Sequence, residues 1–415
     1  AIKYYEEALE IDKKLGQEAD IALYLINIGN VYESWGKYDK AIENYEEALE
    51  IDKKLGQEDG VATCLNNIGN VYESWGQYDK AIKYYEEALA IAEKLGDEGG
   101  VATCLINIGN VYDHWGKYDK AIKNYEEALE IDKKLGQEDG IAIPLNNIGN
   151  VYESWGQYDK AIKNYEEALA INKKLGKEDG VAACLNNIGL VYNSWGQYDN
   201  AIKYYEETLA IDKKLGHKAG VATSLGNIGW VYYSWGQYDK ALKYYKEALA
   251  IDKRLGREAD VAVDLNNIGM VYSSWGQYDK AIKNYEEALA IDKKLGREAS
   301  IAASLDLIGR VYKSWSQYDK AIKYFEEALA IAEELGQEAD IALYLSNIGM
   351  VYCLQGKYKI STKSFIDSIS IKEKLRKTAT GDIRRDYLAS QLYTYQWLTS
   401  AYIRDSDFPS AYQTV

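Results

Sequence analysis

Apolar side chains recur in this chain at alternating steps of four and three residues, the spacing of one face of an α-helix. The first full example has apolar positions at Ile21, Leu25, Ile28, Tyr32 and Trp35. Gly36 follows the last of them, and a glycine there supplies the left-handed residue that ends many helices. The pattern therefore predicts a helix that begins before Ile21 and is closed by Gly36.

A second apolar face begins shortly afterwards and predicts a second helix. Its members are Ala41, Ile42, Tyr45, Ala48, Leu49 and Leu55. Asp39 lies in the turn between the helices, where it suits an N-cap or a first-turn acid, and Gly56 ends the second helix. We call the first helix of each pair helix A and the second helix B. We expect the two to be antiparallel and about 15–18 residues long each.

This pair of helices recurs every forty residues. The segment from Gly36 has close copies that begin at Gly76, Gly116, Gly156, Gly196, Gly236 and Gly276, and Ser316 opens the last copy. Because a unit of this size buries its apolar face only against its neighbours, the fixed period predicts an all-α solenoid. We expect near-identical units over residues 1–357, of which residues 1–16 supply only helix B, and degenerate, truncated units over residues 358–415.

Charge and composition narrow the possible partners. The net charge is −16, with no basic stripe, which argues against binding to nucleic acid or to an anionic membrane. His114 and His217 lie far apart, and no glycine-rich phosphate loop occurs, so we expect no metal, no cofactor and no catalysis in this chain. No apolar run is long enough for a transmembrane helix.

The four cysteines favour a reducing compartment. Cys64, Cys104 and Cys184 occupy equivalent positions of their units, and neighbouring helices pack about 8–10 Å apart, whereas a disulfide needs Cα atoms within about 7 Å. With Cys353 they are expected to be free, small apolar residues, and a cytoplasmic location is expected.

The repeated residues resemble the tetratricopeptide repeat (TPR) family. The pattern of that family, Leu-Gly-x-x-Tyr followed by Ala-x-x-x-Phe/Tyr-x-x-Ala, is matched by Ile28-Gly29 with Tyr32 and by Ala41, Tyr45 and Ala48. The period is forty residues where the family usually has 34, and the proline near the end of helix B is missing. Triplets such as Ile28-Gly29-Asn30 resemble the Leu-Gly-Asn-repeat polarity adaptors and kinesin light chains.

That resemblance implies a right-handed superhelix whose concave wall is made by the A helices and binds an extended peptide. The tail is similar to the segment that joins TPR arrays to a caspase-like CHAT peptidase domain in some bacterial proteins. Here Leu398, Tyr402, Phe408 and Ala411 take the places of Ile28, Tyr32, Tyr38 and Ala41.

The positions that vary between units concentrate in helix A and form four columns. The Asn30 column reads Asn30, Asn70, Asn110, Asn150, Leu190, Trp230, Met270, Arg310 and Met350. The Asn27 column reads Asn27, Asn67, Asn107, Asn147, Asn187, Asn227 and Asn267, and Leu307 breaks it. The Ile26 column reads Ile26, Asn66, Ile106, Asn146, Asn186, Gly226, Asn266, Asp306 and Ser346. The Glu33 column reads Glu33, Glu73, Asp113, Glu153, Asn193, Tyr233, Ser273, Lys313 and Cys353.

By resemblance these columns face the groove, and their chemistry suggests a peptide ligand. An asparagine amide offers both a donor and an acceptor to a peptide backbone. We hypothesise that the basic part of a peptide lies against Glu33, Glu73, Asp113 and Glu153. The wall becomes apolar near Leu190, Trp230, Tyr233 and Met270 and basic at Arg310 and Lys313. An apolar side chain would then lie near Trp230 and Met270, and an acidic group near Arg310.

Plainer alternatives stand beside this hypothesis. The uniform asparagine ladder is equally well explained as framework between neighbouring helices. The tryptophans from Trp35 to Trp315 are expected to fill the core, whereas Trp230 lies outside the apolar step and is either an exposed anchor or drift. The chain could instead be the regulatory region of a larger enzyme such as a CHAT protease, or a solenoid that assembles head to tail.

Overall fold

The computed structural model describes residues 2–378 and 383–405, apart from the side chains of residues 377–391, and these residues form twenty α-helices and no strand. In the regular repeats helix A has 17 residues and helix B has 18. The prediction of an all-α solenoid of helix pairs is therefore confirmed, as are the helix lengths.

The A helices have the even labels and the B helices the odd ones. The A helices are α2 (Glu18–Ser34), α4 (Glu58–Ser74), α6 (Glu98–His114), α8 (Glu138–Ser154), α10 (Glu178–Ser194), α12 (Lys218–Ser234), α14 (Glu258–Ser274), α16 (Glu298–Ser314), α18 (Glu338–Leu354) and α20 (Ile383–Arg404). The B helices are α1 (Ile2–Leu15), α3 (Tyr38–Leu55), α5 (Tyr78–Leu95), α7 (Tyr118–Leu135), α9 (Tyr158–Leu175), α11 (Tyr198–Leu215), α13 (Tyr238–Leu255), α15 (Tyr278–Leu295), α17 (Tyr318–Leu335) and α19 (Tyr358–Thr378).

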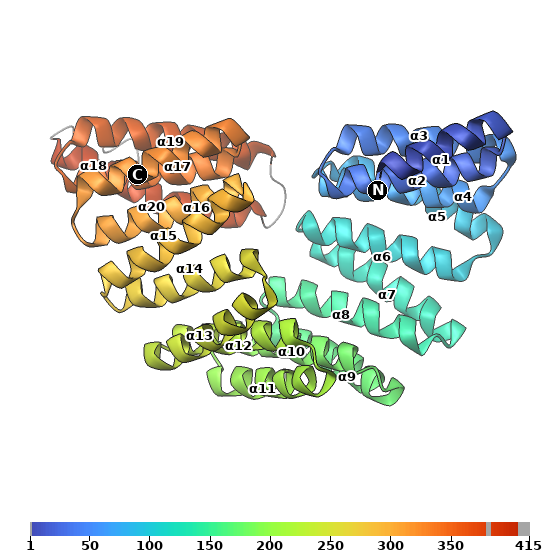
Figure 1. Cartoon of the computed structure of the whole chain (residues 1–415), viewed down its shortest axis with the longest axis horizontal. Helices are drawn as coiled ribbons and strands as arrows, with labels where there is room; N and C mark the ends of the chain where they lie inside the picture. Colours follow the sequence, from blue (N-terminus) through green and yellow to red (C-terminus); the bar gives the residue numbers. More distant parts are fainter. Residues whose placement is uncertain (1, 379–382, 406–415) are drawn as a thin grey trace. The chain divides into compact units, whose positions relative to one another are not determined.

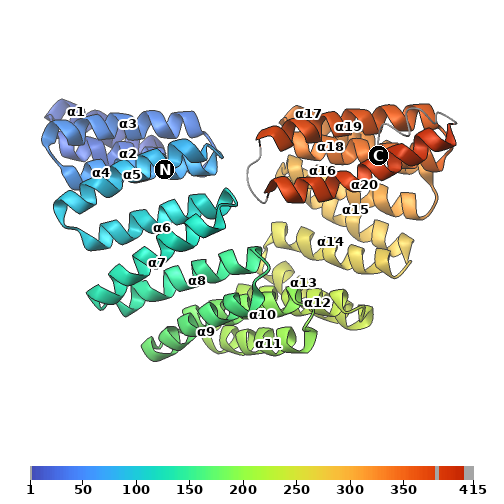
Figure 2. The same ribbon diagram turned by 180° about the vertical axis from the view of Figure 1, so that it is seen from behind.

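The chain divides into two compact units, unit 1 (residues 1–184) and unit 2 (residues 185–415). Within each unit, a helix packs against the helix before it and the helix after it, as Figures 1 and 2 show. The division between near-identical and degenerate repeats at residues 357 and 358 stays a prediction. Helix α20 contains Leu398 and Tyr402, whereas Phe408 and Ala411 lie outside the described residues.

A tyrosine packed against a glycine holds the two helices of each repeat together. The side chain of Tyr45 in α3 is fully buried, and a Cβ placed on Gly29 in α2 would come within 2.5 Å of its Cε1 atom. Ala41 and Ala48 beside it are also fully buried. The small residues of the repeat therefore allow close helix approach, and the tyrosine ring fills the space that remains.

The helix ends agree with the sequence except at one cap. Gly36 and Gly56 have φ of 67° and 70°, so both glycines are the left-handed caps that the sequence predicts. Ser316 adopts the same conformation, with φ of 60°. Helix α3 begins at Tyr38, so Asp39 is a first-turn acid and the alternative of an N-cap is wrong.

The expectation that the tryptophans from Trp35 to Trp315 fill the core is wrong for five of the eight, which are exposed: Trp35, Trp75, Trp195, Trp235 and Trp275. The other three, Trp115, Trp155 and Trp315, are half-buried. Trp75 is 40% exposed, because it follows the last residue of α4 and lies beyond the face that the B helices cover. Its ring stacks on Tyr72 with centroids 6.3 Å apart, and it meets Tyr38 of the preceding repeat at 5.8 Å. These tryptophans therefore form a half-exposed aromatic seam between repeats.

The four cysteines are buried and free. Among the described residues no helix combines the length and the hydropathy that crossing a bilayer requires.

Candidate binding face of the A helices

In unit 1 each asparagine of the Asn30 column accepts a hydrogen bond from the buried tyrosine of its own repeat. The Tyr45 hydroxyl donates to Asn30 Oδ1 at 2.6 Å. The same distance recurs for Tyr85 and Asn70, Tyr125 and Asn110, and Tyr165 and Asn150. A buried hydroxyl that loses its partner costs about 1–3 kcal/mol, so these amide oxygens belong to the framework. The amide nitrogen is then the group that the column can offer to a ligand.

The Asn27 column links successive A helices at three places. Asn147 Nδ2 donates to Asn110 Oδ1 at 3.4 Å in unit 1. In unit 2, Asn227 Nδ2 donates to Asn186 Oδ1 at 2.8 Å. Asn347, which takes the same position forty residues after Leu307, donates from Nδ2 to Asp306 Oδ1 at 2.7 Å. At these places the ladder has the framework role that the sequence left as an alternative. The other members are half-buried: Asn27, Asn67, Asn107, Asn187 and Asn267.

The Glu33 column forms a partly buried acidic stripe in unit 1. Glu33 and Glu73 accept from Tyr45 and Tyr85 at 2.9 and 3.0 Å. Burial raises the pKa of Glu33 and, further along the stripe, the pKa of Asp113. His114 Nδ1 lies 3.0 Å from Glu73 Oε1, and this hydrogen bond raises the pKa of His114. The stripe is therefore acidic as hypothesised, but two of its carboxylates also serve the core.

In unit 2 the Asn30 column holds no asparagine, and its side chains become apolar or basic. Leu190 is 42% exposed and Trp230 is 43% exposed, while Met270 is half-buried. Arg310 is exposed and lies 3.9 Å from Asp306, and burial lowers the pKa of the half-buried Lys313. Met350 ends this exposed surface because it packs in a core cluster with Phe365 and Leu398.

A cavity of about 320 Å³ opens beside Trp230, entirely within unit 2. Its walls are the neighbouring A helices α12 and α14, and α13 contributes Tyr245 and Asp252. Gly226 from α12 and Asp264 from α14 line it. Tyr233, one helical turn further along α12, packs against Trp230 with the rings tilted by 34° and their centroids 5.4 Å apart.

Family models decide what kind of repeat this is. The tetratricopeptide repeat model matches residues 1–54, 60–134, 140–214, 185–254 and 260–334, and a second tetratricopeptide repeat model matches residues 341–377. This chain belongs to the tetratricopeptide repeat family. No curated protein sequence matches the chain.

Two solved structures have a similar fold, and a third resembles a shorter part of this chain. Aspartyl phosphate phosphatase F from Bacillus subtilis is 16% identical with a TM-score of 0.54, over 80% of this chain and 94% of its own. The apo form of the quorum sensor NprR from B. thuringiensis is 19% identical with a TM-score of 0.52, over 80% and 97%. A kinesin light chain candidate from Podosopora anserina is 23% identical with a TM-score of 0.41, over 46% and 95%.

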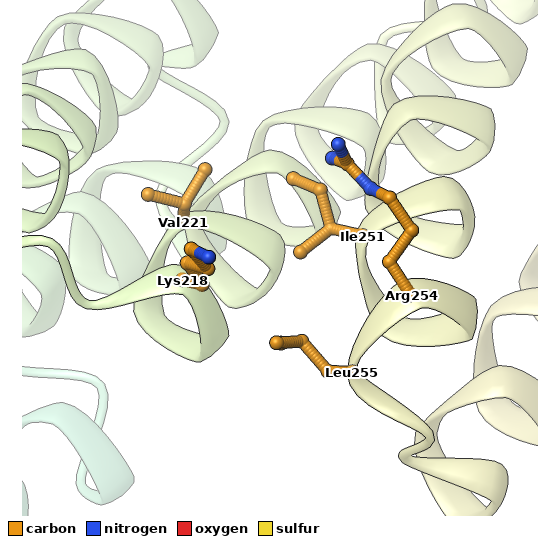
Figure 3. A pocket seen from close by; sticks show the side chains of 5 residues that line it. All are labelled: Lys218, Val221, Ile251, Arg254 and Leu255. Atoms are coloured by element: carbon orange, nitrogen blue, oxygen red, sulfur yellow. The ribbon is translucent and has the colours of Figure 1, made fainter.

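A second cavity, of about 260 Å³, lies at the edge of unit 2. Figure 3 shows Lys218 and Val221 facing Ile251 and Leu255, with the Arg254 side chain at the rim. In other TPR units a lysine at the Arg254 position pairs with a glutamate 36 residues earlier, as Lys94 does with Glu58. Lys218 takes the place of that glutamate, so two exposed cations border an apolar crevice.

Reasoning from the sequence named Asn227, Trp230 and Asn267 of the lining of the cavity beside Trp230 as site residues and missed the others, among them Gly226, Tyr245, Asp252 and Asp264. The signal that could have found them is the departure from the other TPR units. Gly226 is the one glycine of the Ile26 column, and Asp264 stands where other units have Cys64, Cys104, Cys184, Ser224 or Ser304. These two unusual residues lie in successive units, on the neighbouring helices α12 and α14, and both line this cavity.

Proposed function

We propose that this chain is a peptide-binding scaffold whose binding surface is the A-helix face of unit 2, from Leu190 to Arg310. The observation that carries the proposal is the change of side-chain type in the Asn30 column: in unit 1 its asparagines accept from buried tyrosines, whereas in unit 2 Leu190 and Trp230 expose large apolar side chains. Exposed large apolar side chains grouped on one face are typical of interaction surfaces, and tryptophan is often the residue that contributes most to binding.

The side chains along this face differ in chemistry from one end to the other. Trp230 and Tyr233 offer aromatic surface, Met270 adapts its shape to a ligand, and Arg310 offers a cation. The half-buried amides of Asn187 and Asn267 suit hydrogen bonds to a peptide backbone. In unit 1 the acidic stripe from Glu33 to Glu153 is a separate surface that suits basic partners.

Selection of a random peptide library on the full chain tests the proposal. Affinities of the selected peptides are then measured by fluorescence anisotropy for the native chain, for Trp230→Ala and for Trp230→Ala with Arg310→Ala. We expect losses of about tenfold or more for Trp230→Ala, because an aromatic anchor usually contributes more than about 1 kcal/mol. Glu286→Ala, on the exposed side of α15, is the control. Selected peptides that bind all four proteins equally would refute this location of the binding face.

A further inference from the structure

Gly226 leaves a space that the packing of the repeat does not require. A Cβ placed on Gly226 would meet nothing within 4 Å. On the same helix, a Cβ on Gly229 would come within 3.1 Å of Tyr245 Cδ1, so the ring needs that glycine. Glycine in the middle of a helix is less favourable than alanine. A costly residue without a packing role is a mark of a functional position.

In other repeats the residue equivalent to Gly226 reaches the next A helix. Cys104 Sγ donates to Asn66 Oδ1 at 3.7 Å, and Cys184 Sγ donates to Asn146 Oδ1 at 3.6 Å. Asn266 Nδ2 donates to Ser304 Oγ at 3.5 Å. The corresponding pair is Gly226 and Asp264, and glycine has no side chain to reach across. Gly226 therefore lacks the asparagine amide of those repeats, and the residue opposite it is the acid Asp264 in place of a cysteine or a serine.

The floor of the cavity holds two carboxyl groups that face one another. The equivalents of Asp252 accept from a thiol or a hydroxyl, as Asp52 does from Cys64 at 3.6 Å and Asp212 does from Ser224 at 3.0 Å. Asp252 instead meets the carboxyl of Asp264, and Asp264 is only 7% exposed. Protonated Asp264 donates to Asp252, whereas in the ionised form Asp264 Oδ2 has no donor.

A second buried polar atom lacks a partner in the same cavity. The Tyr245 hydroxyl, on a side chain that is 1% exposed, has none, because Trp230 replaces the asparagine that accepts from tyrosine in unit 1. Buried polar groups are almost always hydrogen-bonded, so a phenol and a carboxyl oxygen left open in one cavity indicate a polar ligand.

The charges of the lining specify the sign of that ligand. Asp252, Asp260 and Asp264 line the cavity with a single base, Arg257. Arg257 Nη1 lies 3.0 Å from Asp252 Oδ1, and its Nη2 lies 3.0 Å from Asp260 Oδ2, which leaves Asp264 without an ion pair from that base. Trp230 supplies an aromatic wall, on which a planar cation stacks well.

We propose that this cavity receives the arginine side chain of a peptide bound along the A-helix face of unit 2. The inference rests on the proposed function and names the side chain that the face selects. A guanidinium group donates hydrogen bonds in several directions of one plane, so it can serve Asp264 Oδ2 and the Tyr245 oxygen while its face lies on Trp230. An ammonium group is a point charge without that plane, and it fits less well.

Proton release accompanies this binding. Burial, together with the carboxylates of Asp252 and Asp260, raises the pKa of Asp264 to about 7, and Arg257 opposes the rise. Burial also raises the pKa of Asp252, which Arg257 lowers. Helix α12 adds no ionisable side chain to the lining. A cation displaces the proton of Asp264, so its affinity rises as the pH rises from about 6 to about 8.

Titration of N-acetyl-arginine methylamide into the full chain tests the pocket. Binding is followed by the indole NMR signal of Trp230, which is assigned with Trp230→Phe. We expect a saturable shift of this signal, a weaker one with the lysine counterpart, and none with the neutral citrulline counterpart. Asp264→Asn should weaken binding about tenfold or more, the size expected for a hydrogen bond to a charged group.

Gly226→Asn is the matched variant, because asparagine occupies the same place at residues 66, 146 and 266. It fills the space, and we expect it to abolish the shift while the other indole signals stay in place. Asp264→Ser, which copies Ser304, serves if Gly226→Asn does not fold. Equal shifts with citrulline and arginine, equal binding of lysine, or full binding by both Gly226→Asn and Asp264→Ser would overturn the proposal.

The test of the arginine pocket and the test of the proposed function can give different results. Library peptides that depend on Trp230 and Arg310, together with no response to the arginine probe, would refute the pocket and leave the scaffold standing. A response to the probe that depends on Gly226 and Asp264, with no peptide that depends on Trp230, would support the pocket and refute the scaffold.

Discussion

The hydroxyl of Tyr165 donates to Asn150 Oδ1 at 2.6 Å and so joins the two helices of one repeat. Where the Asn30 column holds Arg310 or Met350, the tyrosine of that repeat is replaced by Phe325 or Phe365. The hydroxyl is thus absent from two repeats that have no asparagine to accept from it. Tyr205, Tyr245 and Tyr285 keep the hydroxyl although Leu190, Trp230 and Met270 replace the asparagine, and the repeat of Trp230 and Tyr245 contains the cavity.

We expect the Asn150 and Tyr165 pair to be energetically coupled. Asn150→Leu, which copies Leu190, should lower the free energy of unfolding by about 1–3 kcal/mol, because it removes the acceptor of a buried hydroxyl. Tyr165→Phe should cost about 1 kcal/mol, and the double variant should cost less than the sum of the two. Urea unfolding of the four proteins measures this. Strict additivity would mean that the hydrogen bond contributes nothing.

Two glycines in the middle of A helices should respond in opposite ways to alanine. In Gly109→Ala the new Cβ would lie 2.6 Å from Tyr125 Cε1, and we expect a loss of about 1–3 kcal/mol from overpacking. In Gly226→Ala the new Cβ meets open space, and we expect a gain of about 0.5–1 kcal/mol from helix propensity. The melting temperatures of both variants, measured against the native chain, test this prediction. Shifts of the same sign would contradict the different packing around Gly109 and Gly226.

Asp264 should make the folded chain less stable as the pH rises through the acid range. Its pKa is raised to about 7 in the folded protein, whereas an unfolded aspartate ionises near pH 4. Between these values the folded state binds more protons than the unfolded state, so the stability falls with rising pH and the fall ends above about 7.

Asp264→Asn removes this titration and keeps a side chain of similar shape. Its stability relative to the native chain should improve by about 2–4 kcal/mol between pH 4 and pH 8. Urea unfolding of both proteins across this range measures the difference, in which the other titrating groups cancel. A difference that does not change with pH would show that Asp264 ionises normally in the folded chain.

Ser316→Gly should stabilise the protein. Ser316 has φ of 60°, a left-handed conformation that glycine adopts without the steric cost of a Cβ atom. We expect a gain of about 1 kcal/mol, visible as a higher melting temperature. The reverse change at an equivalent cap, Gly276→Ser, is the comparison and should lower it by a similar amount, since Gly276 has φ of 74°.

The helices and their caps followed from the sequence because they depend on local properties. The apolar step, the glycine at each helix end and the fixed period are all visible in a single repeat, and Gly36 and Gly56 have the conformation that they predict. The place of Trp75 did not follow, because periodicity gives the direction of a side chain and says nothing of where the covering helix stops. Trp75 continues the apolar spacing of α4, but it lies one residue beyond the last residue of that helix.

The site was harder to predict because its parts come from different repeats. Variation along the Asn30 column pointed to Trp230, which is exposed. Asp252 and Asp264 are two of 65 acidic residues, so composition alone does not distinguish them from the others. Only the contacts show that Asp264 meets Asp252 and that nothing reaches across from Gly226. Gly226 and Asp264 belong to different columns, and comparing residues within one column does not show which residues of two columns are in contact.

The cavity takes Gly226 from one repeat and Asp264 from the next, and this division affects how the chain can evolve. Loss of a forty-residue segment by slippage between near-identical copies of the gene rejoins equivalent positions and keeps every helix pair. If residues 227–266 were lost in this way, Gly226 would be followed 38 positions later by Ser304 in place of Asp264. One such event would change ligand preference in a single generation while leaving the folding of the array intact.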